Sequence, residues 1–112
     1  MDSKMFDYEV GYKLFRLRKD GSLGSLFFNC SYRLPVGCWL AAIPIAKRGF
    51  AYRPGWHILK TPKCPHLSKK GRVIRKVLFC GNVQIHYRPK RQGGIWYTAD
   101  AIYILSDVEN KA

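Results

Sequence analysis

Short apolar runs separated by glycine- and proline-containing turns make up this chain, and no window shows the sustained period of an amphipathic helix. This pattern predicts strands. The expected strands are Val10–Lys19, Ser25–Leu34, Cys38–Ala46, Trp56–Lys60, Val73–Cys80, Val83–Arg88 and Ile95–Leu105. We therefore expect a mostly β fold, either a single compact curved sheet or a small barrel, with at most one short helix. A β-rich α+β fold is the alternative.

Turn signals predict two hairpins in this fold. The Lys-Asp-Gly-Ser-Leu-Gly stretch at 19–24 is typical of a turn between the first two strands. Gly81-Asn82 predicts a second hairpin, between Val73–Cys80 and Val83–Arg88. The last strand is expected to run through Asp100 without a break.

The length of 112 residues and the apolar fraction of 47% fit one domain with its own core. We expect a basic domain over residues 10–106, with a flexible N-terminus (1–9) and a flexible C-terminus (107–112). The acidic N-terminus lacks the apolar stretch of a signal peptide, and four cysteines are too few for a disulfide scaffold. These features predict a cytoplasmic protein with reduced thiols.

Carboxylates are missing from most of the chain. The seventy-nine residues from Gly21 to Ala99 hold fourteen Lys or Arg and no Asp or Glu, and the net charge of the chain is +13. Most hydrolytic and metal-dependent chemistry needs carboxylates, so those functions are disfavoured. The uncompensated charge instead predicts a polyanionic partner, DNA or RNA first and an acidic protein surface second. No membrane partner is expected, because the longest apolar run, Cys38–Ala46, is too short to span a bilayer.

One segment combines aromatic rings with a cation. Tyr52 and Trp56 offer flat faces on which bases could stack, and Arg53 between them could hold a phosphate. We expect these three residues to bind nucleic acid. The alternative is a well-packed turn with Trp56 in the core.

Two basic loops could follow the phosphates. Lys69, Lys70 and Arg72 form the first loop, and Lys90 and Arg91 form the second. Because the two loops flank one predicted hairpin, they could form a ridge. Strand alternation would also place Arg72 and Lys76 on one face and Arg75 on the other. The alternative is two solvated loops that do not converge.

Catalysis is less well supported. Cys64-Pro65-His66 has no second ligand pair, so no metal site is expected, and no motif predicts a cofactor. Two histidines can cleave a phosphodiester without carboxylates, and His57 with His66 or His86 is the candidate pair. An RNase-like enzyme is therefore an alternative, although a non-enzyme is favoured.

The Tyr12–Arg16 strand, the Gly55-Trp56-His57 turn, Pro62 and the strand from Val73 together resemble small ADP-ribosyltransferase-like proteins of phages and bacteria. This resemblance implies nucleotide-facing roles for Arg16 and His57. Such transferases carry a late-strand Glu, whereas this chain has only Asp100 there. The resemblance therefore implies a degenerate enzyme or a binding module. The size and basicity also resemble phage or prophage accessory proteins, which include inhibitors that dock on acidic protein surfaces.

We expect a non-enzymatic binding module that engages nucleic acid, or a nucleic-acid-processing complex, through a cationic face. An enzyme acting on RNA or NAD and a phage-type inhibitor are the two alternatives.

Overall fold

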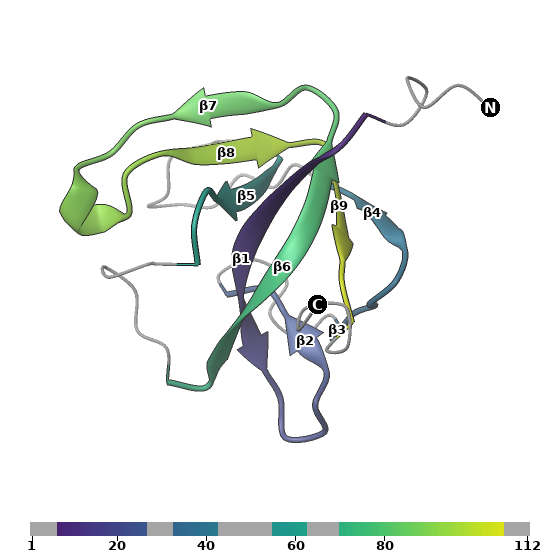
Figure 1. Cartoon of the computed structure of the whole chain (residues 1–112). Coiled ribbons are helices and arrows are strands. Elements are labelled where there is room, and N and C mark those ends of the chain that lie inside the picture. The colour runs from purple at the N-terminus through teal and green to yellow at the C-terminus, as the bar shows by residue number, and fades with distance from the viewer. Residues whose placement is uncertain (1–6, 27–32, 43–54, 63–69, 107–112) are drawn as a thin grey trace, which may run out of the picture.

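A computed structural model describes residues 7–26, 33–42, 55–62 and 70–106, and these residues form a mostly β fold (Figure 1). The strands are β1 (Glu9–Leu17), β2 (Leu23–Gly24), β3 (Arg33–Leu34), β4 (Trp39–Ala41), β5 (Trp56–Leu59), β6 (Arg72–Cys80), β7 (Gln84–His86), β8 (Trp96–Ala99) and β9 (Ala101–Ile104). They form one antiparallel sheet in the order β4-β9-β6-β1-β5-β8-β7, with β2 beside β1 and β3 beside β2. The predicted single sheet is confirmed, and it is not closed into a barrel. The helical element of the described part is a 3₁₀ turn at Lys90–Gln92.

The sheet is strongly curved because β8 and β9 are neighbours in the chain but not in the sheet. Only Asp100 separates them in sequence, yet β6, β1 and β5 lie between them in the strand order. The Asp100 amide donates to the Gly81 carbonyl oxygen at 2.8 Å, and the Asp100 carbonyl accepts from the Ala42 amide at 2.7 Å. The prediction of one continuous strand over Ile95–Leu105 is therefore wrong. The chain bends at Asp100 and changes strand partners there.

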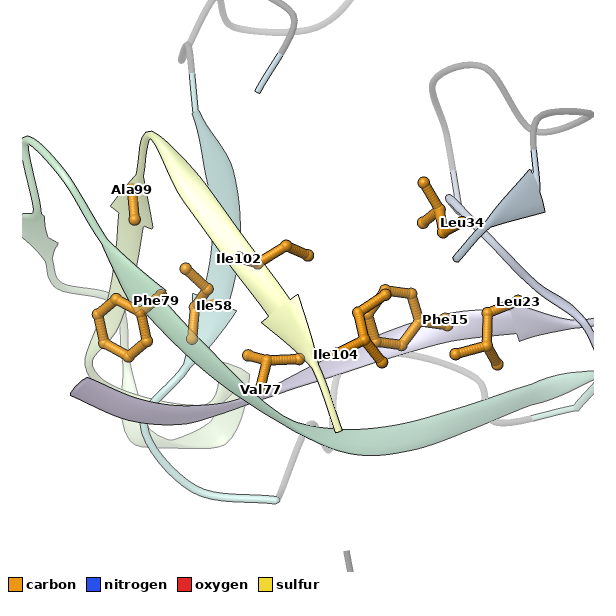
Figure 2. Close-up of a cluster of buried hydrophobic side chains, with 9 residues drawn as sticks. All are labelled: Phe15, Leu23, Leu34, Ile58, Val77, Phe79, Ala99, Ile102 and Ile104. Atoms are coloured by element: carbon orange, nitrogen blue, oxygen red, sulfur yellow. The ribbon is translucent and has the colours of Figure 1, made fainter. Parts of the chain in front are cut away.

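The core lies on the face of the sheet that carries Phe15 and Val77, here called the inner face. β1 and β6 pair in an unbroken register from Glu9 opposite Phe79 to Arg16 opposite Arg72. Side chains alternate between the two faces, so odd-numbered residues of both strands face inward. Side chains from several strands meet there (Figure 2): Phe15, Leu23, Leu34, Ile58, Val77, Phe79, Ala99, Ile102 and Ile104.

The hairpins differ from those expected. The chain does turn back after β1, but only the two residues of β2, Leu23–Gly24, pair with β1. β2 also pairs with β3. Residues 27–32, in the middle of the predicted second strand, lie outside the described residues. The predicted hairpin of Val73–Cys80 with Val83–Arg88 is wrong, because β7 pairs with β8. A strand has two edges, and β1 and β9 occupy both edges of β6.

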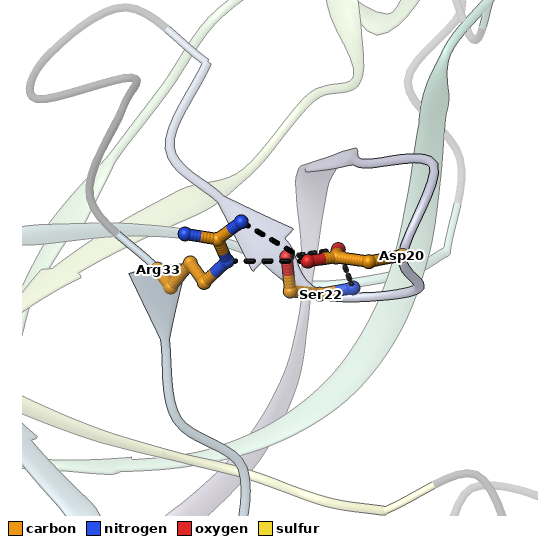
Figure 3. Close-up of polar contacts among 3 residues, drawn as sticks. All are labelled: Asp20, Ser22 and Arg33. Atoms are coloured by element: carbon orange, nitrogen blue, oxygen red, sulfur yellow. Dashed lines mark hydrogen bonds and ion pairs between the residues drawn. The ribbon is translucent and has the colours of Figure 1, made fainter.

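A small polar cluster closes the β1–β2 turn (Figure 3). One Asp20 carboxylate oxygen accepts from the Ser22 hydroxyl at 2.6 Å and from the Ser22 amide at 2.9 Å. The other oxygen accepts from the Arg33 guanidinium, at 3.1 Å from Nη2. These bonds, those from the Ser22 hydroxyl and amide foremost, lower the pKa of Asp20 from 3.8 to about 2. The cluster thus ties the turn to β3.

We expect Asp20→Asn to remove part of the acid sensitivity of the fold. A carboxylate whose pKa is lower in the folded than in the unfolded state stabilises the fold above the unfolded value, 3.8. That contribution is lost as the pH falls through about 2. The effect is small because Asp20 is exposed. Thermal unfolding of the wild type and the variant between pH 3.8 and about pH 2 measures the effect. Identical pH profiles of the two proteins would contradict the lowered pKa of Asp20.

Candidate nucleic-acid interface

The outer face of the β1–β6 ladder carries a line of cations. Arg16 of β1 lies directly opposite Arg72 of β6, and Tyr12 lies opposite Lys76. The Leu17 amide donates to the Gly71 carbonyl oxygen at 2.9 Å, which extends the pairing one residue beyond Arg16. Two further cations follow at that end of the ladder, Arg18 just after β1, with its Nε atom buried, and Lys70 just before β6. We call the whole set the cationic row: Arg16, Arg18, Lys70, Arg72 and Lys76.

This register brings like charges together in the middle of the sheet. Besides the Arg16–Arg72 pair, it sets Lys13 opposite Arg75 on the inner face. Like charges directly across a strand pair repel and are destabilising. Such pairs in two adjoining central strands concentrate positive potential along the ladder.

The described carboxylates are Asp7, Glu9, Asp20 and Asp100. Glu9 is on β1, but its odd position places it on the inner face. Asp20 is bonded within the β1–β2 turn, and Asp100 sits at the bend between β8 and β9. Asp7 precedes β1, at the opposite end of the ladder from Arg16. In the strand register, none of these four carboxylates lies directly opposite a residue of the row.

The outer face continues across the sheet from β1 to β7. Tyr12 pairs with Leu59 of β5, Leu59 with Trp96 of β8, and Trp96 with His86 of β7. Residues that pair directly lie on the same face. The cationic row and Trp96 thus lie on one face of the sheet, although Trp96 itself is buried, with 4% of its surface exposed.

Trp96 is the centre of a second group on this surface. The His86 ring stacks on the indole, with centroids 4.3 Å apart, and the Arg88 guanidinium lies 4.4 Å from the indole centroid. His57, from β5, lies at 5.0 Å. His86 Nε2 is 2.9 Å from the hydroxyl of Thr98, which is buried. We call these five residues the Trp96 cluster; it places two histidines and an arginine around one indole.

Lys13 is half-buried on the inner face. Its ammonium donates to the His57 carbonyl oxygen at 2.8 Å and lies 5.9 Å from the Phe15 ring centroid and 5.8 Å from that of Trp56. Burial disfavours the charged form and lowers the pKa of Lys13 from 10.5 to about 8. The chain therefore keeps a costly charge next to its core.

We expect Lys13→Met to stabilise the fold at pH 7 by on the order of 1–2 kcal/mol, because it removes a desolvated charge but also a hydrogen bond. Between pH 8 and 10.5 the unfolded wild type binds more protons, so its stability rises with pH. The variant should lack this rise. Urea unfolding at pH 7 and pH 10 measures both effects, with the exposed Lys60→Met as the control. A variant less stable than wild type at pH 7 would contradict the account.

The described residues of the two predicted basic loops do not meet. Lys70 and Arg72 belong to the cationic row, at the start of β6. Lys90 and Arg91 are exposed in the 3₁₀ turn, at the far end of the β7–β8 arm (Figure 1). The described residues of the two loops therefore do not form the expected ridge, and the cations that share a face are those of β1 and β6.

The predicted aromatic segment is only partly described. Trp56 is half-buried against the core, and its indole Nε1 donates to the Leu40 carbonyl oxygen at 2.9 Å. It lies on the inner face, whereas its neighbour His57 points outward. A ligand contact by Trp56 stays a prediction. Four predicted site residues lie outside the described residues: Tyr52, Arg53, His66 and Lys69.

Sequence reasoning missed the contribution of β1 to the row. The ADP-ribosyltransferase resemblance implies a role for Arg16, and no predicted basic loop or motif includes Arg18. Their spacing of two residues in an alternating strand was the available signal. The Trp96 cluster had no such signal, since it depends on how β5, β8 and β7 pair.

No helix among the described residues is long and apolar enough to cross a membrane. In the same part of the chain, no three His, Cys, Asp or Glu side chains gather in a way that could hold a metal ion. Comparisons of the chain with models of protein families, with curated proteins and with solved structures found no match.

Proposed function

We propose that this protein binds nucleic acid through the outer face of the β1–β6 ladder, with the cationic row following the phosphates. The observation that carries the proposal is the register that sets Arg16 directly opposite Arg72. The Arg16 guanidinium donates to the Leu26 carbonyl oxygen at 3.3 Å, and a phosphate above the pair would offset the repulsion between the two like-charged side chains. Arginine suits this role because its planar fork donates two hydrogen bonds to one phosphate.

The dimensions of the row fit a polyanion better than a single small anion. The row follows β6 from Lys76 to Lys70, about 20 Å at roughly 3.3 Å per residue. A duplex carries one phosphate per strand for about every 3.4 Å of its axis, so a row of this length faces several phosphates. The backbone pairing of two central strands holds the cations at fixed spacing, which reduces the ordering cost of binding.

Salt dependence tests this function. We expect micromolar or tighter binding of a fluorescent 12-nucleotide DNA or RNA at 50 mM salt, measured by anisotropy. If the five cations of the row each neutralise a phosphate, log K should fall against log salt with a slope between about −3.5 and −4.5. Raising the salt fourfold would then weaken binding about 100- to 500-fold. Absence of binding at 50 mM to single-stranded and duplex DNA and RNA would overturn the proposal and favour an acidic protein partner.

RNA cleavage is a second candidate function, and the observation that favours it is the placement of His57 and His86 against the same indole. One imidazole would take the proton of a 2′-hydroxyl as its oxygen attacks phosphorus. The other would protonate the departing 5′-oxygen, which leaves a 2′,3′-cyclic phosphate and a 5′-hydroxyl.

Incubation with a labelled RNA tests this second function. Cleavage should be lost in His57→Ala and in His86→Ala, while binding by the cationic row is retained. Intact RNA after prolonged incubation with the wild type would exclude it. The same incubation with NAD tests the nucleotide-facing roles that the family resemblance implies for Arg16 and His57.

A further inference from the structure

Three aromatic side chains gather at the other end of the β1–β6 ladder. The Trp39 ring of β4 lies 5.6 Å from the ring centroid of Tyr103 of β9 and 6.4 Å from that of Tyr8, just before β1. Tyr8 is 51% exposed. We call Tyr8, Trp39 and Tyr103 the aromatic platform.

The platform lies on the same face as the cationic row. Val10 of β1 pairs with Leu78 of β6, Leu78 with Tyr103, and Tyr103 with Trp39. Val10 and Arg16 are both even-numbered residues of β1, so they project from the same side of the sheet. Within the cationic row, Lys76 lies closest to the platform along β6, two residues before Leu78.

This surface therefore changes character along its length. At the Arg16 end it offers cations, and at the Tyr8 end it offers aromatic rings and the exposed side chain of Val10. Phosphates are attracted to the first kind of surface, and the flat faces of nucleobases to the second. In a duplex the base faces are covered by neighbouring base pairs and cannot reach a protein ring.

We propose that the outer face selects single-stranded over duplex nucleic acid by stacking unpaired bases on the aromatic platform while the cationic row holds the adjoining phosphates. This inference rests on the proposed function and names the form of nucleic acid that the site takes. On β1 the buried Leu14 separates the two parts of this face, so the nucleic-acid strand would pass from Arg72 to the platform by way of Lys76 on β6.

A comparison of one 12-nucleotide strand, alone and annealed to its complement, tests the preference. At the same salt concentration, we expect the single strand to bind at least tenfold more tightly than the duplex. Equal affinity, or tighter binding of the duplex, would overturn this inference but leave nucleic-acid binding in place. No binding of either form would instead overturn the proposed function.

Variants of the platform separate stacking from charge. Tyr8→Ala should weaken single-strand binding at least about fivefold and leave the salt slope unchanged, because it removes a ring and no phosphate contact. Tyr87→Ala is the matched control: Tyr87 is 76% exposed and follows β7, away from the platform. It should bind like wild type.

Trp39→Leu provides a second variant, with circular dichroism to establish that it folds. If Trp39→Leu does not fold, the affinity of Tyr8→Ala for the single strand alone tests the role of the platform. Quenching of tryptophan fluorescence by the bound strand should also be reduced in Trp39→Phe. Unchanged single-strand affinity in the folded platform variants, or an equal loss in Tyr87→Ala, would overturn the role of the platform.

Discussion

Gly11→Val is expected to destabilise the fold by about 3 kcal/mol or more, because Gly11 faces the core where β1 crosses β5. A Cβ atom at this position would collide with Ile58 Cγ2 and would lie 2.9 Å from Phe79 Cε1 and 3.0 Å from the Leu59 carbonyl oxygen. Ile58 and Phe79 are themselves buried, so neither can move aside without disturbing the packing. Urea denaturation followed by circular dichroism measures the loss.

Gly21→Ala is the control for this prediction. Gly21 lies in the β1–β2 turn, where an added Cβ meets nothing within 4 Å, but its φ of +86° disfavours other residues. We expect a cost of about 1 kcal/mol from backbone strain alone. If Gly11→Val were no worse than Gly21→Ala, the close packing of β1 on β5 would be refuted.

The triple variant Arg16→Gln/Arg72→Gln/Lys76→Gln is expected to bind nucleic acid at least about 100-fold more weakly at 50 mM salt. Three phosphate contacts would be lost, so the salt slope should also become shallower by about 2 to 3. The fold should persist, because glutamine keeps much of the side-chain length and relieves the repulsion between Arg16 and Arg72. Anisotropy titrations at several salt concentrations measure both quantities.

A second triple variant, Lys60→Gln/Lys90→Gln/Arg91→Gln, removes the same charge away from the cationic row. We expect it to lose much less affinity, through the weaker overall field alone. The comparison also tests the sequence-based prediction that Lys90 and Arg91 follow phosphates. Equal losses in the two triple variants would mean that net charge, and not the row, governs binding.

Local patterns predicted the strands well and their partners poorly. Alternation located β1, β5 and β6 to within one or two residues, because each has one face in the core. The break at Asp100 was not predictable, since it depends on hydrogen bonds to Gly81 and Ala42, far away in sequence. The prediction of a hairpin between β6 and β7 was wrong for a related reason. A turn signal at Gly81-Asn82 cannot show that two other strands already occupy both edges of β6.

In the candidate site, too, local patterns predicted the face of a side chain but not the strand that lies beside it. Alternation within β6 correctly separated Arg72 and Lys76 from Arg75. That Arg16 lies opposite Arg72, however, follows from a register between segments more than fifty residues apart. Lys13 shows that charge alone does not locate the surface, because this lysine lies beside the core.

The most direct test of the account is a nuclear magnetic resonance titration of the ¹⁵N-labelled protein with a single-stranded 12-mer. The side-chain Nε–Hε signals of Arg16 and Arg72 and the backbone amides around Lys76 should shift most. Signals of Lys90 and Arg91 should shift least. Shifts concentrated at Lys90 and Arg91, or spread evenly over all the basic residues, would contradict a binding face built by β1 and β6.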